Sequence, residues 1–367
     1  MPERKRVLLV VGTRPNFMKI APVAAALRRR PSEFEPILVH TGQHYDAAMS
    51  DVFLAELGIG EPEHVLSVGS GTHAQQTARV MERLEGVLEE ERPDVVVVPG
   101  DVNSTVGAAL AAVKLDIPVG HVEAGLRCFD RTMPEEVNRV VTDAVSDLLF
   151  VHSPEARENL LREGRPDDSI HYVGNTMIDS LVAMRERFEG LDAPSRHGLE
   201  RGGYLLATLH RPELVDGPLL AEAMAGLREV TREMPVVFPV HPRTRARLTN
   251  GDADGLRLLE PLGYLEFLGL LGGAAGVLTD SGGVQEEATF LAVPCLTLRR
   301  NTERPVTVEE GTNLVLGLRP ERIVEAPTLA AQISARERRC PALWDGGAGE
   351  RIADVLAGDT PRPDFAG

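Results

Sequence analysis

Cysteine and long apolar runs are scarce in this sequence of 367 residues. The three cysteines, Cys128, Cys295 and Cys340, are odd in number, widely spaced and without a CxxC pair, so neither a disulfide framework nor a zinc site is indicated. No apolar run approaches the roughly 20 residues that a membrane-spanning helix needs. Residues 1–6 lead directly into a predicted strand rather than an apolar leader. These features predict a protein of the reducing cytoplasm.

Basic residues are also in deficit, with 39 Lys and Arg against 55 Asp and Glu, for a formal net charge of -16. Nucleic acids and anionic membrane surfaces are bound by basic stripes, so neither is expected as a partner. An anionic ligand must then be held locally, by individual arginines and by helix starts.

The length and the hydrophobic pattern predict two α/β domains. Single cores stop growing beyond roughly 250 to 300 residues, and short apolar runs alternate with helical patterns in both halves. Such alternation is typical of doubly wound parallel sheets, whose ligands bind at the carboxyl ends of the strands. We expect two Rossmann-like domains facing a central cleft: 1–174, with a final helix in 350–367 packing back onto it, and 175–349. The polar segment 186–203 marks the region of the boundary.

The expected elements follow from apolar runs and 3.6-residue periodicity. Strands are predicted at 7–11, 36–39, 95–98, 117–122, 148–151, 171–173, 204–208, 236–240, 256–259, 276–279 and 295–298. The principal helices are predicted at 18–30, 47–57, 73–90, 104–114, 134–144, 219–233, 284–291 and 349–356.

The segment 274–291 has the pattern of a phosphate-binding turn. An apolar strand leads into Asp-Ser-Gly-Gly and then a helix, so Ser281, Gly282 and Gly283 can bring backbone N–H groups close to an anion. Glu286 and Glu287 follow one turn later, where a carboxylate can accept from a ribose diol. The pattern favours a nucleotide diphosphate; an ordinary strand-to-helix connection capped by Ser281 is the alternative.

Acidic residues stand at the ends of two predicted strands. Asp101 follows an all-apolar strand and could instead cap the next helix. Glu123 ends a buried strand, where a carboxylate must be partnered or used; a salt bridge to Arg127 is the competing interpretation. Glu135 lies in an acidic first helical turn that needs no function to explain it.

Basic and polar residues stand at several other strand ends. Arg14 and Lys19, a little over one turn apart at a helix start, suit a diphosphate, and the Gln43-His44 loop could line the same mouth. In the second half, a His beside an Arg could bind phosphate or transfer protons. These second-half residues are His210, Arg211, His241 and Arg304. Surface basicity is the alternative for Arg14, Lys19 and these second-half residues, and a loop with one satisfied histidine is the alternative for Gln43-His44.

These motifs together resemble the non-hydrolysing UDP-N-acetylglucosamine 2-epimerases. The motifs run in family order from residue 12 to residue 317: GTRP with Lys19, GQH, GD, VEAGLR, PEE with NR, HR, LTDSGGVQEEA and TERP. The resemblance implies two Rossmann-like domains of the glycosyltransferase-B type, a homodimer, and a UDP-sugar substrate. It implies interconversion of UDP-GlcNAc and UDP-ManNAc through UDP elimination to 2-acetamidoglucal and re-addition, without nicotinamide or metal as cofactor.

The resemblance also assigns roles to residues. It implies that Asp101, Glu123 and Glu135 are the catalytic acids and His210 the essential histidine. Diphosphate contacts would come from Arg14, His210, Ser281, Gly282, Gly283 and Arg304, the ribose contact from Glu287, and the uracil neighbour would be Phe267. Gln43 and His44 would belong to a second, activating UDP-GlcNAc site.

Several positions depart from the family pattern. Asn16, Leu214 and Val306 replace the usual Glu, Asn and Glu, Asp46 stands where a basic or amide residue is expected, and residues 68–71 supply no arginine for the activator site. These departures leave room for an epimerase of a modified UDP-sugar. A glycosyltransferase of the same fold and a non-catalytic UDP-sugar binder are the rival classes, and three acids around C2 of the sugar favour neither.

Overall fold

The chain forms two compact units. The computed structural model describes residues 4–42, 56–249, 251–337 and 339–358. Cα packing divides the chain into a first unit, Met1–Val182 with Ala342–Gly367, and a second unit, Ala183–Pro341. Each unit contains a parallel sheet with its own buried core.

The first unit is built on a seven-stranded sheet of order β3-β2-β1-β4-β5-β6-β7, in which every neighbouring pair is parallel. The apolar run 95–98 of its central strand β4 is fully buried, as expected for a parallel strand covered by helices on both faces. The strands are β1 (Lys5–Val11), β2 (Phe34–His40), β3 (His64–Val65), β4 (Val95–Pro99), β5 (Val119–Val122), β6 (Leu148–Val151) and β7 (Ile170–Tyr172).

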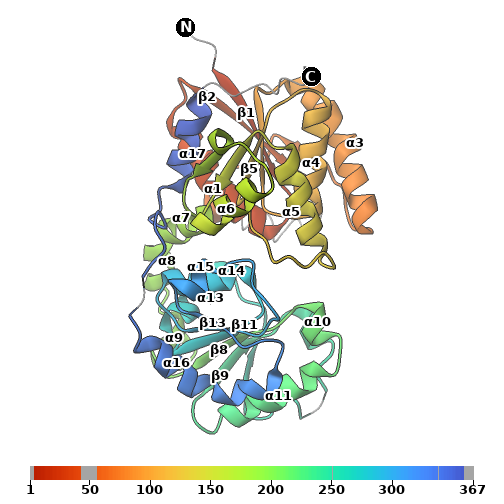
Figure 1. The fold of residues 1–367 in the computed structure, drawn as a ribbon. Coiled ribbons are helices and arrows are strands. Elements are labelled where there is room, and N and C mark those ends of the chain that lie inside the picture. The colour runs from red at the N-terminus through yellow and green to blue at the C-terminus, as the bar shows by residue number, and fades with distance from the viewer. Residues whose placement is uncertain (1–3, 43–55, 250, 338, 359–367) are drawn as a thin grey trace. The chain divides into compact units, whose positions relative to one another are not determined.

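Helices cover this sheet, and the C-terminal helix α17 packs on α1, beside which it lies in Figure 1. A side chain at Gly349 would meet the Pro22 carbonyl oxygen at 2.6 Å, so glycine permits this close packing. Lys5 Nζ donates to the Leu356 and Gly358 carbonyls at 2.9 and 2.7 Å, which satisfies the end of α17. The helices are α1 (Arg14–Arg29), α3 (His73–Glu91), α4 (Asn103–Lys114), α5 (Pro134–Val145), α6 (Pro154–Arg162), η1 (Asp167–Ser169), α7 (Thr176–Ala183) and α17 (Ala348–Ala357).

The second unit contains a six-stranded parallel sheet of order β10-β9-β8-β11-β12-β13. Its strands are β8 (Leu205–Thr208), β9 (Val236–Pro239), β10 (Arg257–Leu259), β11 (Gly276–Thr279), β12 (Cys295–Thr297) and β13 (Asn313–Val315). Its helices are α8 (Arg185–Gly190), α9 (Ala193–Arg196), α10 (Pro212–Val215), α11 (Leu219–Val230), α12 (Pro242–Arg245), α13 (Tyr264–Gly273), α14 (Gly282–Phe290), α15 (Val306–Glu309), η2 (Pro320–Glu325) and α16 (Ala326–Ser334).

The expected α/β class with two Rossmann-like parallel sheets is confirmed. The division between the units falls at Val182 and Ala183, later than residue 174, because Ser180 and Asp179 bond within the first unit, to the Met18 carbonyl and the Gly349 N–H. Short strands β3 and β13 and helix α13 were not expected. Of the helix predicted at 47–57, residues 47–55 lie outside the described residues.

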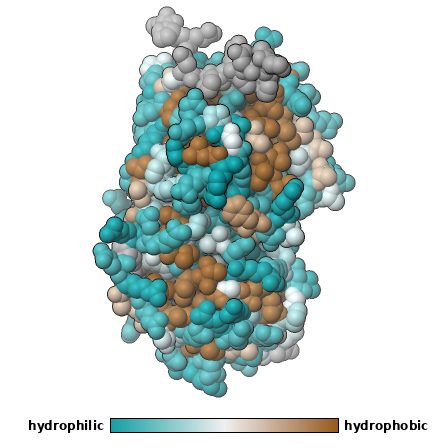
Figure 2. All heavy atoms as spheres, viewed as in Figure 1, coloured by the Kyte–Doolittle hydropathy of each residue, from teal (hydrophilic) through white to brown (hydrophobic). Residues whose placement is uncertain are grey.

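The face of the molecule drawn in Figure 2 is mostly polar. Polar and charged side chains cover most of the face drawn in Figure 2, and apolar side chains gather in separate patches on each unit. In the described part of the chain, no helix combines the length and the apolar character required to cross a bilayer.

Candidate active site

Two acid-bearing turns lie side by side in the first unit. Asp101 follows β4 and Glu123 follows β5, and these two strands are paired. The Gly100 N–H donates to the Val122 carbonyl at 2.9 Å. A side chain at Gly100 would meet Lys19 Nζ at 2.6 Å and Glu123 Oε2 at 3.3 Å, so the two turns and the start of α1 are in contact. This is the carboxyl edge of the sheet, where doubly wound folds bind ligands.

Asp101 is held by two residues of helix α5, Arg139 and Asn138, for which no role was predicted. Its Oδ2 accepts from Arg139 of α5, and Arg139 Nη1 also donates to Glu136 Oε2 at 2.8 Å. Asn138 Nδ2 donates to the Asp101 carbonyl at 3.0 Å. The N-cap of α4 is Val102, without a side-chain cap, so the alternative that Asp101 caps this helix is wrong. Its carboxylate is oriented and charge-compensated by Arg139.

Glu123 adopts a left-handed backbone conformation, with φ of +71°, which is strained for a residue with a side chain. Its Oε2 contacts Lys19 Nζ, and both side chains are buried. The competing salt bridge to Arg127 is not formed, because Arg127 pairs with Asp143 at 2.7 Å and Glu163 at 2.5 Å. The structure therefore places Lys19, expected at a diphosphate, beside an acid. Arg14 is the first residue of α1.

Glu135 differs from its neighbour Glu136. Glu136 is buried and accepts from the backbone N–H groups of Cys128 and Phe129 at 3.1 and 2.8 Å. Glu135 is half-buried in the first turn of α5, and within the described ranges no hydrogen bond or ion pair holds its carboxylate. The second acid of the PEE motif thus anchors the loop before α5, whereas the first is available to a ligand.

The predicted phosphate-binding turn lies in the second unit, at the start of α14. Ser281 is the extended N-cap of α14, which begins at Gly282. A side chain at Gly282 would overlap the Arg304 guanidinium and lie 2.8 Å from Glu303 Oε1, so the absence of a side chain lets these two groups approach the helix start. The start of α14 therefore combines free N–H groups with a neighbouring guanidinium, a suitable environment for a phosphate.

The two glutamates of α14 have different surroundings. Glu286 Oε1 lies 3.1 Å from Arg304 Nε, so this carboxylate orients the guanidinium. Glu287 Oε1 accepts from the Tyr264 hydroxyl at 2.8 Å. Tyr264 begins α13, and Phe267 is one turn further along that helix. The predicted ribose and uracil neighbours thus share one corner of the unit.

Asp280 was not among the predicted site residues, yet it contacts two of them. Its Oδ2 accepts from the backbone N–H groups of His210 and Arg211, both at 2.8 Å, and its Oδ1 lies 3.0 Å from His210 Nδ1. Burial alone would raise the pKa of Asp280, but His210 and the two N–H donors hold it below its usual value. An acid at the end of an apolar strand was the signal, the same pattern that identified Asp101.

His210 and His241 also lie together, with ring centroids 5.7 Å apart. The pKa of His241 is lowered, mainly by burial and to a smaller extent by the positive charges of His210 and Arg243. Arg211 Nε donates to the Asp280 carbonyl at 2.9 Å, which directs this arginine toward the same turn. Asp280 thus organises the histidine and arginine at the end of β8.

Replacing Asp280 by Asn is expected to destabilise the second unit in a pH-dependent way. A carboxylate with a lowered pKa stabilises the fold above its unfolded pKa of about 3.9, and this contribution is lost as the pH falls through the folded value. Hydrogen bonds to a charged group are worth roughly 1.5 to 3 kcal/mol. Calorimetric unfolding should show a deficit of that size at pH 7 that shrinks below about pH 4. A deficit equal at pH 7 and pH 3 would contradict an ionised Asp280.

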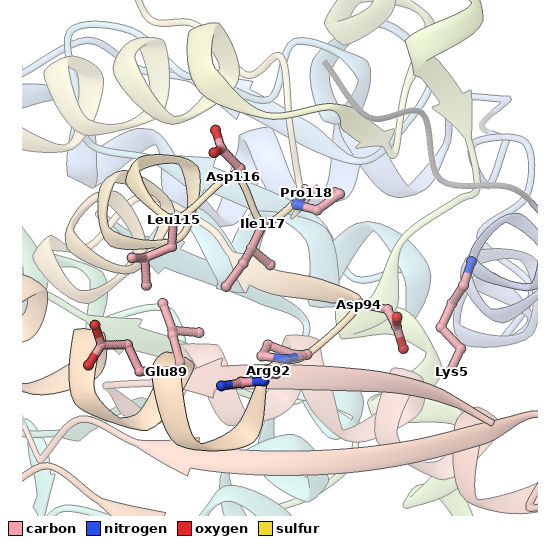
Figure 3. A pocket seen from close by; sticks show the side chains of 10 residues that line it. Lys5, Glu89, Arg92, Asp94, Leu115, Asp116, Ile117 and Pro118 are labelled. Atoms are coloured by element: carbon pink, nitrogen blue, oxygen red, sulfur yellow. The ribbon is translucent and has the colours of Figure 1, made fainter. Parts of the chain in front are cut away.

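A separate surface hollow of about 700 Å³ lies at the opposite edge of the first sheet. Figure 3 shows its lining residues, which come from the start of β1, the end of α3 and the segments leading into β4 and β5. These are the amino ends of the strands, whereas Asp101 and Glu123 are at the carboxyl ends. The hollow is therefore not part of the candidate active site.

The predicted activator residues Gln43 and His44 lie outside the described residues. The neighbouring Gly42 carbonyl accepts from the Gly69 N–H at 2.9 Å. Arg79 of α3 donates to the Val68 and Ser70 carbonyls at 3.2 and 3.1 Å. An arginine thus reaches the 68–71 segment from α3, although the segment itself contains none.

Comparison with known proteins identifies the family of this chain. The family model for UDP-N-acetylglucosamine 2-epimerase matches residues 25–357. The UDP-N-acetylglucosamine 2-epimerase of Methanocaldococcus jannaschii is 42% identical, over 96% of this chain and 98% of that protein. The UDP-2,3-diacetamido-2,3-dideoxy-D-glucuronate 2-epimerase of Pseudomonas aeruginosa is also 42% identical, over 96% and 99%.

A solved structure has the same architecture. The crystal structure of the Methanocaldococcus jannaschii enzyme, in complex with UDP-GlcNAc and UDP, superposes with a TM-score of 0.85 at 40% identity, covering 96% of this chain and 99% of that one. The fold is thus the two-unit glycosyltransferase-B type. The chain belongs to the UDP-N-acetylglucosamine 2-epimerase family and is an isomerase.

Proposed function

We propose that this protein interconverts UDP-GlcNAc and UDP-ManNAc. Family membership supports the reaction, and the start of α14 supports binding of the diphosphate. The observation that carries the proposal is the pair of acids on neighbouring turns, Asp101 and Glu123, each already compensated by a cation. A glycosyltransferase moves no proton at C2, so it has no need of such acids.

The proposed chemistry is an elimination followed by an addition. A carboxylate takes the proton from C2, a double bond forms between C1 and C2, and the C1–O bond breaks so that its electron pair leaves with UDP. The 2-acetamidoglucal then receives a proton on the other face of C2, and UDP adds again to C1. The overall change is not a redox reaction, so no oxidant, nicotinamide or metal is required by its balance.

The residue roles fall into three groups. We assign Asp101, Glu123 and Glu135 to proton transfer at the sugar, and Lys19, through its contact with Glu123, to the same end of the substrate. Arg14, His210, Arg211, His241, Ser281, Gly282, Gly283 and Arg304 are assigned to the diphosphate. Glu287 and Phe267 are assigned to the nucleoside. Cations and helix N–H groups at the diphosphate stabilise the charge that develops on departing UDP.

Incubation of the purified protein with UDP-GlcNAc alone tests this proposal. Chromatography should show UDP-ManNAc appearing until both sugars reach a constant ratio, with no free hexosamine. UDP-2,3-diacetamido-2,3-dideoxy-D-glucuronate should be tested in parallel, because the 2-epimerase named for that sugar in Pseudomonas aeruginosa is also 42% identical to this chain. If the protein turns over that sugar and not UDP-GlcNAc, that sugar is the substrate and UDP-GlcNAc is not. Transfer of the sugar to an acceptor would contradict an epimerase.

The resemblance also supports a cytoplasmic homodimer as the working form. Analytical ultracentrifugation at micromolar concentration should give twice the chain mass of 39.8 kDa. A monomer that is fully active at the same concentration would contradict this part of the proposal.

A further inference from the structure

A buried group of charged residues lies directly beneath the two acid-bearing turns. His121 on β5 and Asp143 on α5 have side chains that are almost completely inaccessible, and Arg127 is buried with them. None of these residues belongs to the site proposed above. Charged groups are rarely retained in such a place unless they are paired and used.

The His121 ring connects Asp143 to the turn that carries Asp101. Its Nε2 lies 2.7 Å from the Gly100 carbonyl, and Gly100 immediately precedes Asp101. A carbonyl oxygen can only accept, so Nε2 donates. The other nitrogen, Nδ1, lies 2.6 Å from Asp143 Oδ1. The position of this turn is thus linked to Asp143 through one imidazole ring.

The second oxygen of Asp143 holds the other turn. Asp143 Oδ2 accepts from the Gly125 N–H at 3.1 Å and from Arg127 Nη1 at 2.7 Å. Burial alone would raise the pKa of Asp143, but the charges and hydrogen bonds of His121 and Arg127 hold it below its usual value. A carboxylate is therefore fixed between the two turns.

These turns have backbone conformations that need external support. Gly100, Glu123 and Gly125 all have positive φ values, of +66°, +71° and +78°. For Glu123 this conformation is strained, and such strain persists only when the surroundings determine it. A side chain at Gly125 would overlap the Ala156 carbonyl, so this turn is also closely packed from behind.

We infer that Asp143 is a positioning residue that holds both acid-bearing turns, through His121 on one side and Gly125 on the other. The expected effect on turnover rests on the proposed function, because the two turns carry Asp101 and Glu123, the acids assigned to proton transfer. That Asp143 holds the two turns in place can be tested without any substrate.

Hydrogen exchange with two variants tests the structural content. Asp143→Asn removes the charge that serves both turns, so exchange should accelerate by ~10-fold or more at the Gly100 and Gly125 amides alike. His121→Asn is too short to bridge Asp143 and Gly100, so only the Gly100 amide should accelerate while Gly125 stays protected by Asp143. Asp147→Asn is the matched control, because Asp147 is four residues along and accepts from Val119 N at 2.8 Å but contacts neither turn.

Turnover of UDP-GlcNAc then tests the consequence. Asp143→Asn should lower kcat by ~30-fold or more while KM stays within about 3-fold, as expected for lost positioning in the transition state. Asp147→Asn should match the wild type. Fluorescence of Trp344, the sole tryptophan and buried in the first unit, reports whether each variant is folded. If Asp143→Asn does not fold, His121→Asn supplies the same test for the Gly100 turn.

The possible results separate the inference from the proposed function. Unchanged exchange at both amides, or a kcat equal to that of Asp147→Asn, would overturn the inference. A wild-type protein without turnover would overturn the proposed function instead, and the exchange measurements would still decide whether Asp143 holds the turns.

Discussion

Replacing Asp101 by Asn is expected to reduce turnover of UDP-GlcNAc by ~100-fold or more, the scale of positioned acid-base catalysis. The amide can still bond with Arg139, so the turn should keep its place, but it can neither accept nor return a proton at C2. The affinity for UDP should stay within about 3-fold of the wild type, because a group acting only at the reacting centre contributes little to binding elsewhere.

Steady-state kinetics and calorimetry with UDP measure these two effects separately. Asp116→Asn provides a matched control: Asp116 lies before β5, in the hollow at the amino edge of the same sheet, and its left-handed backbone suits Asn. Turnover within a few-fold of wild type for Asp101→Asn would remove Asp101 from the chemistry. Loss of UDP binding would contradict the assignment of Asp101 to proton transfer at the sugar alone.

Replacing Glu287 by Ala is expected to produce the opposite pattern, weakening UDP binding by roughly 10- to 100-fold, the range for hydrogen bonds to a charged group. We assign this carboxylate to the ribose hydroxyls. The variant should also lose any preference for UDP over 2′-deoxy-UDP, since that preference depends on an acceptor for the missing hydroxyl.

The contact with Tyr264 requires its own control, because removing Glu287 also removes the acceptor of the Tyr264 hydroxyl. Tyr264→Phe removes that hydroxyl and keeps the carboxylate, so its UDP affinity should remain close to wild type. Calorimetric titration of the three proteins with UDP and 2′-deoxy-UDP completes the comparison. A Glu287→Ala variant that still discriminates between the two nucleotides would contradict the ribose assignment.

The sequence was informative where local pattern determines structure. Apolar runs such as 95–98 predicted the parallel sheets, and Asp-Ser-Gly-Gly before a helix predicted the start of α14. Short pairings of two or three residues, such as β3 and β13, depend on neighbouring strands rather than on local preference. They were therefore not predicted.

Side-chain partners were less predictable, because they depend on which elements become neighbours. Glu123 was expected to pair, if at all, with Arg127, four residues away, yet its partner Lys19 comes from α1. Asp280 was read as part of a turn, although its oxygens bond the residues that follow β8. Both partnerships cross between elements that are distant in sequence, which a pattern read along the chain does not reveal.

Proton NMR of the purified protein with UDP-GlcNAc in deuterated water is the most direct test of the central claim. A carboxylate should remove the C2 proton, and a deuteron from the solvent should take its place. The C2 proton signal should therefore disappear from both UDP-GlcNAc and UDP-ManNAc, without added nicotinamide or metal. Conversion to UDP-ManNAc with the C2 proton retained would contradict proton transfer at that carbon, and transfer of the sugar without C2 exchange would contradict an epimerase.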